Sequence, residues 1–318
     1  MRVKEEDSPI IKAVNQVYHG TTIADLEADY FHQYGHIDRW TLFSDYSFAS
    51  GKLNDVVTFS FLPFIQNPFE LGSMINLLAP GEIKQTRSVS PAFASFLRHL
   101  PFLSFSFVIS NHKYGFYNNY QNYKASLLLS LDNLYNSIPG WNEQDPFQKE
   151  TNIAIGRKIK KIRNYIEQDK KHRVLRNLIL ITTIGGFLAT LVANRTQCTK
   201  MGWFSDRDEI NDMEKNFSLD LFNITFIQYL YDKYLCKFLA APADSKSDEF
   251  YADLIKIPDY LTGALADYNQ TSQTASHSKF STLIDDVIAN NRRNIFIYNM
   301  DFHNGQYFPT CSRLMFNR

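Results

Sequence analysis

The feature that most limits how this chain can fold is an uncharged apolar segment, Asn177 to Asn194, which reads NLILITTIGGFLATLVAN between Arg176 and Arg195. Its length lies at the lower limit for a membrane-spanning helix. Three threonines, two asparagines and the pair Gly185-Gly186 dilute its hydrophobicity. A single span here would also place acidic residues that precede and follow it on opposite sides of a bilayer. We therefore expect a helix buried in a large core, and no membrane partner.

The composition is that of a globular protein without a strong overall field. The chain has 318 residues, of which 44% are hydrophobic, which suits one large or two small domains. Lysine plus arginine equals aspartate plus glutamate at 33 each, so no net charge attracts nucleic acid. The densest basic run, Arg157 to Arg163 followed by Lys170 to Arg173, is either a solvated helix surface or a strip that faces nucleic acid.

Cysteine usage and the first residues indicate a cytoplasmic protein. The three cysteines, Cys198, Cys236 and Cys311, are isolated and form no CxxC motif, which is typical of reduced thiols. The opening MRVKEEDSPIIK contains no apolar stretch and lacks the pattern of a signal peptide.

Runs of β-branched and aromatic residues alternate with helical patterns, which indicates an α/β fold. Strands are expected at residues 40–49, 56–64, 103–110 and 201–205. Helices are expected at residues 70–78, 90–100, 120–137, 217–238 and 257–268, with a long helical stretch at 151–194 that breaks near Gly185-Gly186. This order fits a mixed sheet flanked by helices.

The same pattern divides the chain into three parts. Residues 1–39 are expected to form an N-terminal helical extension, and residues 40–270 an α/β core with a long helical insertion at about 141–195. Residues 271–318 are expected to form a linker and a C-terminal hairpin that turns at Asn304-Gly305.

Acidic residues stand where predicted strands and helices meet their loops. Asp45 closes the first strand, Asp206 and Asp208 follow the fourth, and Asp259 begins the last core helix. A carboxylate beside an apolar run is costly unless it is paired or binds a cation. Carboxylates that converge repel one another, and a divalent cation relieves that repulsion. Each aspartate alone can equally be a turn or cap residue.

The ligand types favour a hard cation. Carboxylates without neighbouring histidine or cysteine suit Mg²⁺ or Mn²⁺ better than zinc. Two such cations about 4 Å apart can activate water and stabilise the leaving oxygen of a phosphodiester.

These residues resemble a large group of bacterial proteins named domain of unknown function 3800. The matching elements are FSDYSF with VVTFSFLPF, then Glu82-Ile83-Lys84, then the helix PDYLTGAL that starts at Pro258. The resemblance covers residues 40–268. In the first element the family has Glu-Ser-Gly after its aspartate, whereas this chain has Tyr46-Ser47-Phe48.

The resemblance implies a ribonuclease-H-like fold and a metal-dependent nuclease. It assigns Asp45, Asp206 (or Asp208) and Asp259 as metal ligands and catalytic acids. It also implies Glu82 as a further catalytic acid, and Lys84 as a group that neutralises phosphate or positions a neighbouring acid.

Two functions therefore stay open. The first is a metal-dependent nuclease that cleaves phosphodiester bonds in a nucleic acid, as part of a prokaryotic defence system. The second is a catalytically inactive ribonuclease-H-like subunit that binds a protein partner or a second copy of itself. The altered first motif and the neutral charge favour the second.

Other motifs have less support. The sequence His19-Gly20-Thr21 is similar to an element of ADP-ribosyltransferases, and His32 and His36 have a spacing that can hold zinc on a helix. Patterns for a Walker loop, a dinucleotide fingerprint or an α/β-hydrolase nucleophile are absent from the sequence.

Overall fold

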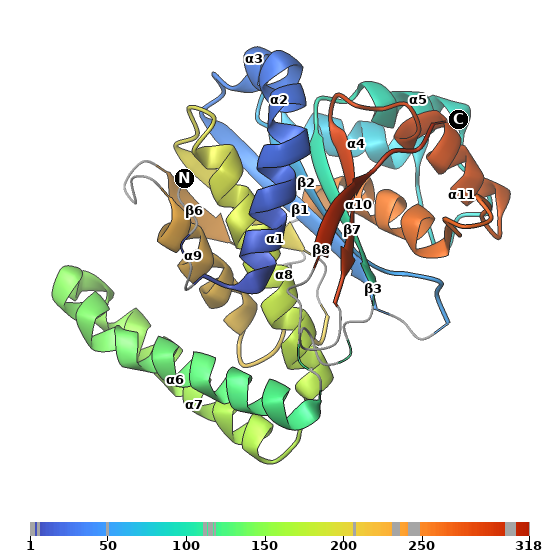
Figure 1. Cartoon of the computed structure of the whole chain (residues 1–318). Coiled ribbons are helices and arrows are strands. Elements are labelled where there is room, and N and C mark those ends of the chain that lie inside the picture. The colour runs from blue at the N-terminus through green and yellow to red at the C-terminus, as the bar shows by residue number, and fades with distance from the viewer. Residues whose placement is uncertain are drawn as a thin grey trace.

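The described residues form a seven-stranded mixed β-sheet with helices on both faces (Figure 1). The computed structural model describes residues 4, 7–48, 51–110, 113, 117, 119–205, 208–230, 236–240, 249–302 and 310–317, and for 249–251 only the backbone. The α/β class expected from the sequence is confirmed at this level.

The sheet has the order β6-β5-β1-β2-β3-β7-β8. Strands β1, β2 and β3 form an antiparallel meander, and β5 and β6 continue it parallel to β1. On the other side β7 pairs parallel with β3, and β8 pairs antiparallel with β7. The strands are β1 (Arg39–Ser47), β2 (Asp55–Pro63), β3 (Leu103–Ser110), β5 (Lys200–Ser205), β6 (Lys237–Ala240), β7 (Ile295–Asp301) and β8 (Thr310–Leu314).

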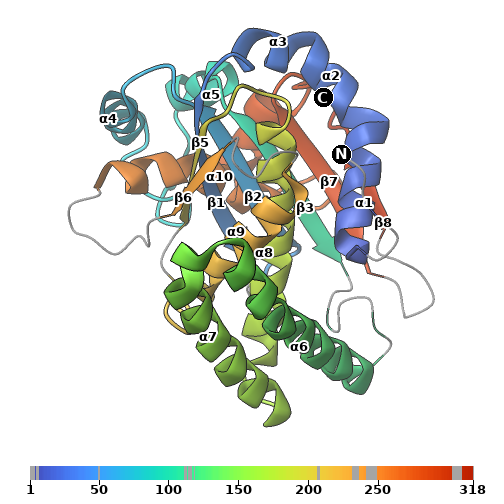
Figure 2. The ribbon, with the colours of Figure 1, turned by 90° about the vertical axis from the view of Figure 1, so that its left-hand side faces the viewer.

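Helices cover the sheet in two groups (Figure 2). Helices α8 and α9 and the N-terminal helices pack on the face that carries Leu42, Phe59 and Phe105. Helices α4, α5, α10 and α11 pack on the face that carries Phe43 and Val108. The helices are α1 (Pro9–Val17), α2 (Ile23–Asp25), α3 (Phe31–Tyr34), α4 (Pro68–Leu78), α5 (Pro91–His99), α6 (Tyr120–Gln144), α7 (Lys149–Glu167), α8 (His172–Ala193), α9 (Phe217–Tyr229), α10 (Glu249–Asp267) and α11 (Ser278–Thr282).

Helix α1 and strand β8, near the two ends of the described chain, pack against each other. Helix α1 packs against α8 and against β8 (Figure 1). The guanidinium group of Arg313 on β8 donates to the backbone oxygen of Thr21 at 2.6 Å and to Asp25 Oδ2 at 2.5 Å. The first and last elements of the described chain are therefore held together directly.

Helix α8 contains the uncharged segment and is buried in the core. Of the described helices it is the one that is long and apolar enough to cross a membrane, and 78% of that apolar window is buried inside the protein. A Cβ atom at Gly185 would lie 2.6 Å from the ring of Phe59 and 2.7 Å from the ring of Phe222. The glycines therefore let the helix approach β2 and α9 closely, and the break expected at Gly185-Gly186 does not occur.

Several predicted helix limits were wrong. The break in residues 151–194 comes earlier, between α7 and α8, where Asp169 and Lys171 have left-handed backbone angles. Helix α6 passes through Pro139, and α10 begins nine residues before Pro258 (Glu249 to Pro258). The helix expected at 217–238 ends at Tyr229, and strand β6 follows.

Helices α6 and α7 form a hairpin arm that projects beyond the sheet (Figures 1 and 2). Two contacts show that these helices run antiparallel. Near the α6–α7 connection the Asn152 amide donates to Asn142 Oδ1 at 2.9 Å, and farther from it Arg163 Nε donates to Asp132 Oδ1 at 2.9 Å. The C-terminal strands β7 and β8 pair antiparallel, and the turn expected at Asn304-Gly305 lies outside the described residues.

Candidate functional site

Asp45 lies on the central strand β1, on the face that α10 covers. Successive side chains of a strand point to opposite faces, so Asp45 shares the face of Phe43, which packs in the core beneath α10. The hydroxyl of Thr262 on α10 donates to the backbone oxygen of Asp45 at 3.4 Å. The carboxylate of Asp45 is thus presented from the sheet beside α10.

A row of hydroxyl side chains continues from Asp45 across the sheet. Asp45 pairs with Thr58 on β2, and Thr58 pairs with Ser106 on β3. The hydroxyls of Thr58 and Ser106 lie 2.9 Å apart, and both residues are fully buried. Each buried hydroxyl in a core needs a partner, and these two supply one to each other. The alternation of hydroxyl and apolar residues in VVTFSF and LSFSFV is the sequence signal for this row, which was not predicted.

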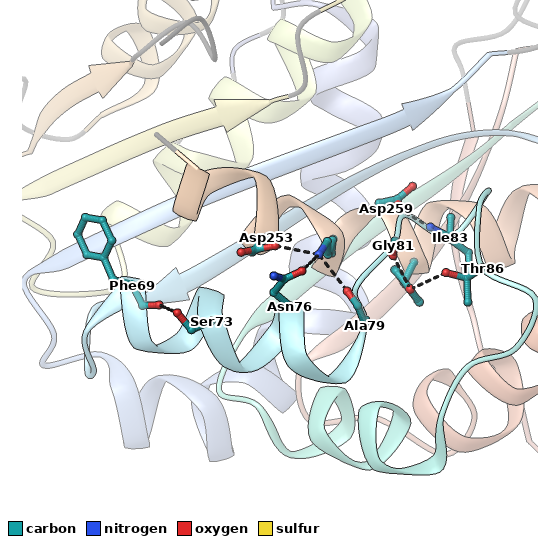
Figure 3. A network of polar contacts seen from close by, with 11 residues as sticks. Phe69, Ser73, Asn76, Ala79, Gly81, Ile83, Thr86, Asp253 and Asp259 are labelled. Carbon is teal, nitrogen blue, oxygen red and sulfur yellow. Dashed lines mark hydrogen bonds and ion pairs between the residues drawn. The ribbon is translucent and has the colours of Figure 1, made fainter. Parts of the chain in front are cut away.

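Asp259 lies on α10 and holds the loop that carries the Glu-x-Lys element. Its Oδ2 accepts a hydrogen bond from the backbone N–H of Ile83 at 2.9 Å (Figure 3). The next residue, Tyr260, donates from its hydroxyl to the backbone oxygen of Gly81 at 2.8 Å. Two elements named by the sequence analysis, 176 positions apart, are therefore in direct contact.

Two buried lysines fix the same loop, residues 79–86. The ammonium group of Lys279 donates to the backbone oxygens of Ile83 and Thr86, both at 2.7 Å. Lys256 donates to the backbone oxygen of Ala79 at 2.9 Å. Lys256 lies on α10 and Lys279 on α11, so both helices hold this loop. Figure 3 shows the contacts that α10 makes with Ala79, Gly81 and Ile83.

Glu82 and Lys84 lie at the exposed side of this loop. Their charged groups form an ion pair of 2.7 Å, with 43% of the Glu82 side chain and 74% of the Lys84 side chain exposed. An exposed pair of this kind contributes little to stability. Both side chains are therefore accessible next to Asp259, which is what contact with a substrate would require.

Asp208 has different surroundings from Asp45 and Asp259. Its Oδ1 accepts from the backbone N–H of Asn211 at 2.8 Å, and Asn211 donates to the hydroxyl of Tyr46 at 2.7 Å. Tyr46 points to the face opposite Asp45, since the two are adjacent on β1. Burial raises the pKa of the Asp208 carboxyl and of the Tyr46 hydroxyl. Asp208 is thus a partly buried carboxyl beneath Tyr46.

Asp206 lies outside the described residues. Strand β5 ends at Ser205, which pairs with Ser44, the residue before Asp45. In the described part of the chain, no three His, Cys, Asp or Glu side chains come close enough to hold a metal ion. Asp45 and Asp259 carry carboxylate oxygens, the donor type that Mg²⁺ and Mn²⁺ prefer, but neither belongs to such a group among the described residues.

The basic run on α7 is largely engaged in ion pairs. Lys158 bonds to Asp220 at 2.6 Å, and Arg163 bonds to Asp132 at 2.9 Å. Lys161 lies 3.3 Å from Glu214. These contacts favour a structural and solvated surface over a strip that faces nucleic acid.

The shorter motifs lie in the N-terminal helical segments. His19-Gly20-Thr21 lies within a π-helical turn, Tyr18–Thr22, where the Thr21 hydroxyl donates to the backbone oxygen of Val17 at 2.9 Å. His32 lies on α3, and no metal-binding group includes it among the residues that the structure describes.

Comparisons of the chain with protein-family models, with characterised proteins and with solved structures give no match.

Proposed function

We propose that this chain is a metal-dependent nuclease with a ribonuclease-H-like core. The observation that carries the proposal is the contact between Thr262 and the backbone of Asp45. Asp259 precedes Thr262 by three residues of α10, just under one turn and about 4.5 Å along the helix axis. The Thr262 contact holds this part of α10 beside Asp45 on β1. The proposal is that the carboxylates of Asp45 and Asp259 converge there on a shared cation.

The strand order supports the ribonuclease-H-like part of the proposal. Such a core has an antiparallel meander of three strands, and two further strands added parallel to the first. A last helix covers the face opposite to the earlier helices. The order β3-β2-β1-β5-β6 follows this scheme, with α8 and α9 on one face and α10 on the other.

The proposed roles follow from position. Asp45 and Asp259 would bind Mg²⁺ or Mn²⁺, and of the two acids after β5 we prefer Asp206 as the third ligand. Asp208 is less suitable because it is bonded to Asn211 on the other face of the sheet. A bound cation would supply an activated water and stabilise the leaving oxygen. Lys84, exposed beside Asp259, would neutralise a phosphate of the substrate.

A second function is favoured by one specific observation. Asp259 already satisfies the N–H of Ile83, and Glu82 already pairs with Lys84. These acids can therefore be purely structural, as in a ribonuclease-H-like subunit that has lost activity and binds a protein partner or a second copy of itself. The replacement of the family's second acid by Tyr46 agrees with this alternative.

One experiment separates the two functions. Cleavage of single- and double-stranded DNA and RNA is measured with Mg²⁺, with Mn²⁺ and with a chelator, for the wild type, Asp45→Asn and Asp259→Asn. The exposed arm residue Asp132 gives a matched control, Asp132→Asn. We expect cation-dependent cleavage that both site variants lower by about 100-fold or more, and a rise in Tm with the cation in the wild type and the control only.

The inactive subunit gives the opposite result. The wild type then shows no cation-dependent cleavage and no cation-dependent Tm, while both site variants fold as the wild type does. That result would overturn the nuclease proposal.

A further inference from the structure

Two cysteines that are isolated in the sequence meet in the structure. The Sγ atoms of Cys198 and Cys236 lie 3.2 Å apart and share a hydrogen bond. Both side chains are buried, at 0% and 4% exposed. A disulfide bond has a length of about 2.05 Å, so the sulfurs need to approach by only roughly 1 Å.

The backbone holds the two thiols in this position. Cys198 precedes β5 and Cys236 precedes β6, and these strands are parallel neighbours that pair from Lys200 and Lys237 onward. The backbone N–H of Lys237 also donates to the oxygen of Thr199 at 2.9 Å. The approach of the thiols is thus fixed by sheet pairing rather than by a chance side-chain rotamer.

We propose that Cys198 and Cys236 form a site of covalent modification, at which a peroxide converts the two thiols into one intramolecular disulfide. This inference does not depend on the proposed nuclease function.

The reaction balances in two steps. One thiol loses its proton and attacks a peroxide oxygen; an S–O bond forms, the O–O bond breaks, and hydrogen peroxide leaves one water. The second thiol then attacks the sulfenic sulfur; the S–S bond forms, the S–O bond breaks, and the hydroxyl takes up the proton of the second thiol and leaves as a second water. Both sulfurs are oxidised by one electron each, and the two peroxide oxygens are reduced.

The disulfide would tie an edge of the sheet to its interior. In the described sheet, β6 pairs only with β5 and has four residues. The bond would link the start of β6 to the start of β5 and close a loop that contains α9. A loop of this size is long enough for the cross-link to raise Tm by about 5 °C or more.

The third cysteine supplies an internal control. Cys311 lies on β8, at the edge of the sheet opposite to β6. It is too far away to pair with either of the other two within one molecule. Oxidation should therefore consume two thiols and leave one.

The test treats the full chain with a molar excess of hydrogen peroxide, unfolds it, and counts thiols with a chromogenic disulfide reagent. We expect the count to fall from three to one in the wild type, and from two to zero in Cys311→Ser. Cys198→Ser and Cys236→Ser should each keep both remaining thiols on the same timescale. A mass loss of two hydrogens, a cross-linked peptide that contains Cys198 and Cys236, and a Tm rise reversed by a thiol reductant complete the expected result.

Two results would overturn the proposal. In one, the folded wild type keeps three thiols over a period in which the unfolded chain is fully oxidised. In the other, the thiols that disappear are found as sulfinic acids or in dimers linked through Cys311.

Discussion

Asp259 on α10 accepts a hydrogen bond from the backbone N–H of Ile83 at 2.9 Å, across 176 positions of the chain. This contact gives one carboxylate two separable tasks. One oxygen completes the hydrogen bonding of the 79–86 loop, and the negative charge is what a cation would need. Substitutions that preserve one task and remove the other can distinguish them.

Asp259→Asn should keep the loop and lose the charge, because the amide oxygen still accepts from Ile83. We expect a change in the free energy of unfolding of less than about 1 kcal/mol. Asp259→Leu leaves the N–H of Ile83 without its acceptor, at a cost of about 1 to 3 kcal/mol. Urea unfolding measures both values. Equal losses of stability in the two variants would contradict the claim that Asp259 stabilises the loop through its hydrogen bond with Ile83.

Lys279→Met should destabilise the protein by about 2 to 4 kcal/mol, because it leaves two carbonyl oxygens, those of Ile83 and Thr86, without a charged donor. The matched control is Lys84→Met, on the loop that Lys279 binds. There the exposed ion pair with Glu82 contributes about 0 to 1 kcal/mol to stability. Urea midpoints of the two variants give the comparison. A control that loses as much stability as Lys279→Met would show that the buried donor has no special role.

Gly185→Ala should destabilise the protein although alanine is the better helix former. The added Cβ would lie 2.6 Å from Phe59 and 2.7 Å from Phe222, and overpacking costs about 1 to 3 kcal/mol. Gly140→Ala on α6 is the control, since nothing lies within 4 Å of its added Cβ, and it should gain up to about 1 kcal/mol. Thermal unfolding of both variants should shift Tm in opposite directions, and a shift in the same direction would refute the close packing of α8.

Titration of the Asp220 carboxyl should make the free energy of unfolding decrease as pH rises. Burial raises the pKa of its carboxyl, although the bond to Lys158 opposes that rise. The folded state therefore holds its proton more tightly than the unfolded chain, whose pKa is near 3.8. The stability that this group contributes is present below pH 3.8 and is lost as pH passes the raised value. Compared with Asp220→Asn, the wild type should lose stability across that window; urea midpoints that run parallel in the two proteins would disprove it.

The sequence predicted the central strands well because the residue types within each strand already indicate that it is buried. In β2 every residue after Asp55 is buried, so the run VVTFSFLP needs β-branched and aromatic residues throughout. Strand β6 escaped prediction because it has only four residues and follows closely after an apolar helix. Its place is decided by pairing with β5, which is a tertiary contact.

Two prolines, Pro139 and Pro258, led to wrong predictions of helix limits for a related reason. Proline is favoured at the start of a helix and disfavoured inside it, and that rule predicted an end at Pro139 and a start at Pro258. Both residues lie inside helices. Ile138 of α6 is buried against α7, where a Cβ on Gly156 would meet it at 3.1 Å. This packing stabilises the helix beyond the proline, and one sequence gives no sign of it.

The candidate site was predicted in part. The position of Asp45 on a strand and its face follow from alternation, and the structure adds that Asp259 and the Glu82-Lys84 loop are neighbours. The divergence of Asp208 could not be foreseen, because it depends on bonds to Asn211 and so to Tyr46. The meeting of Cys198 and Cys236 was hidden for the same reason: spacing along the chain says nothing of two parallel strands that begin side by side.

The packing of α1 against both α8 and β8 has a consequence for synthesis on the ribosome. The apolar side of α1, which includes Ile10, Val14 and Val17, is made long before its partner strand at residues 310–314. Until that strand emerges from the exit tunnel, these apolar side chains must be kept from associating with other apolar surfaces. The growing polypeptide is thus a natural client for a ribosome-bound chaperone, and messages truncated before β8 should yield aggregates rather than a smaller folded protein.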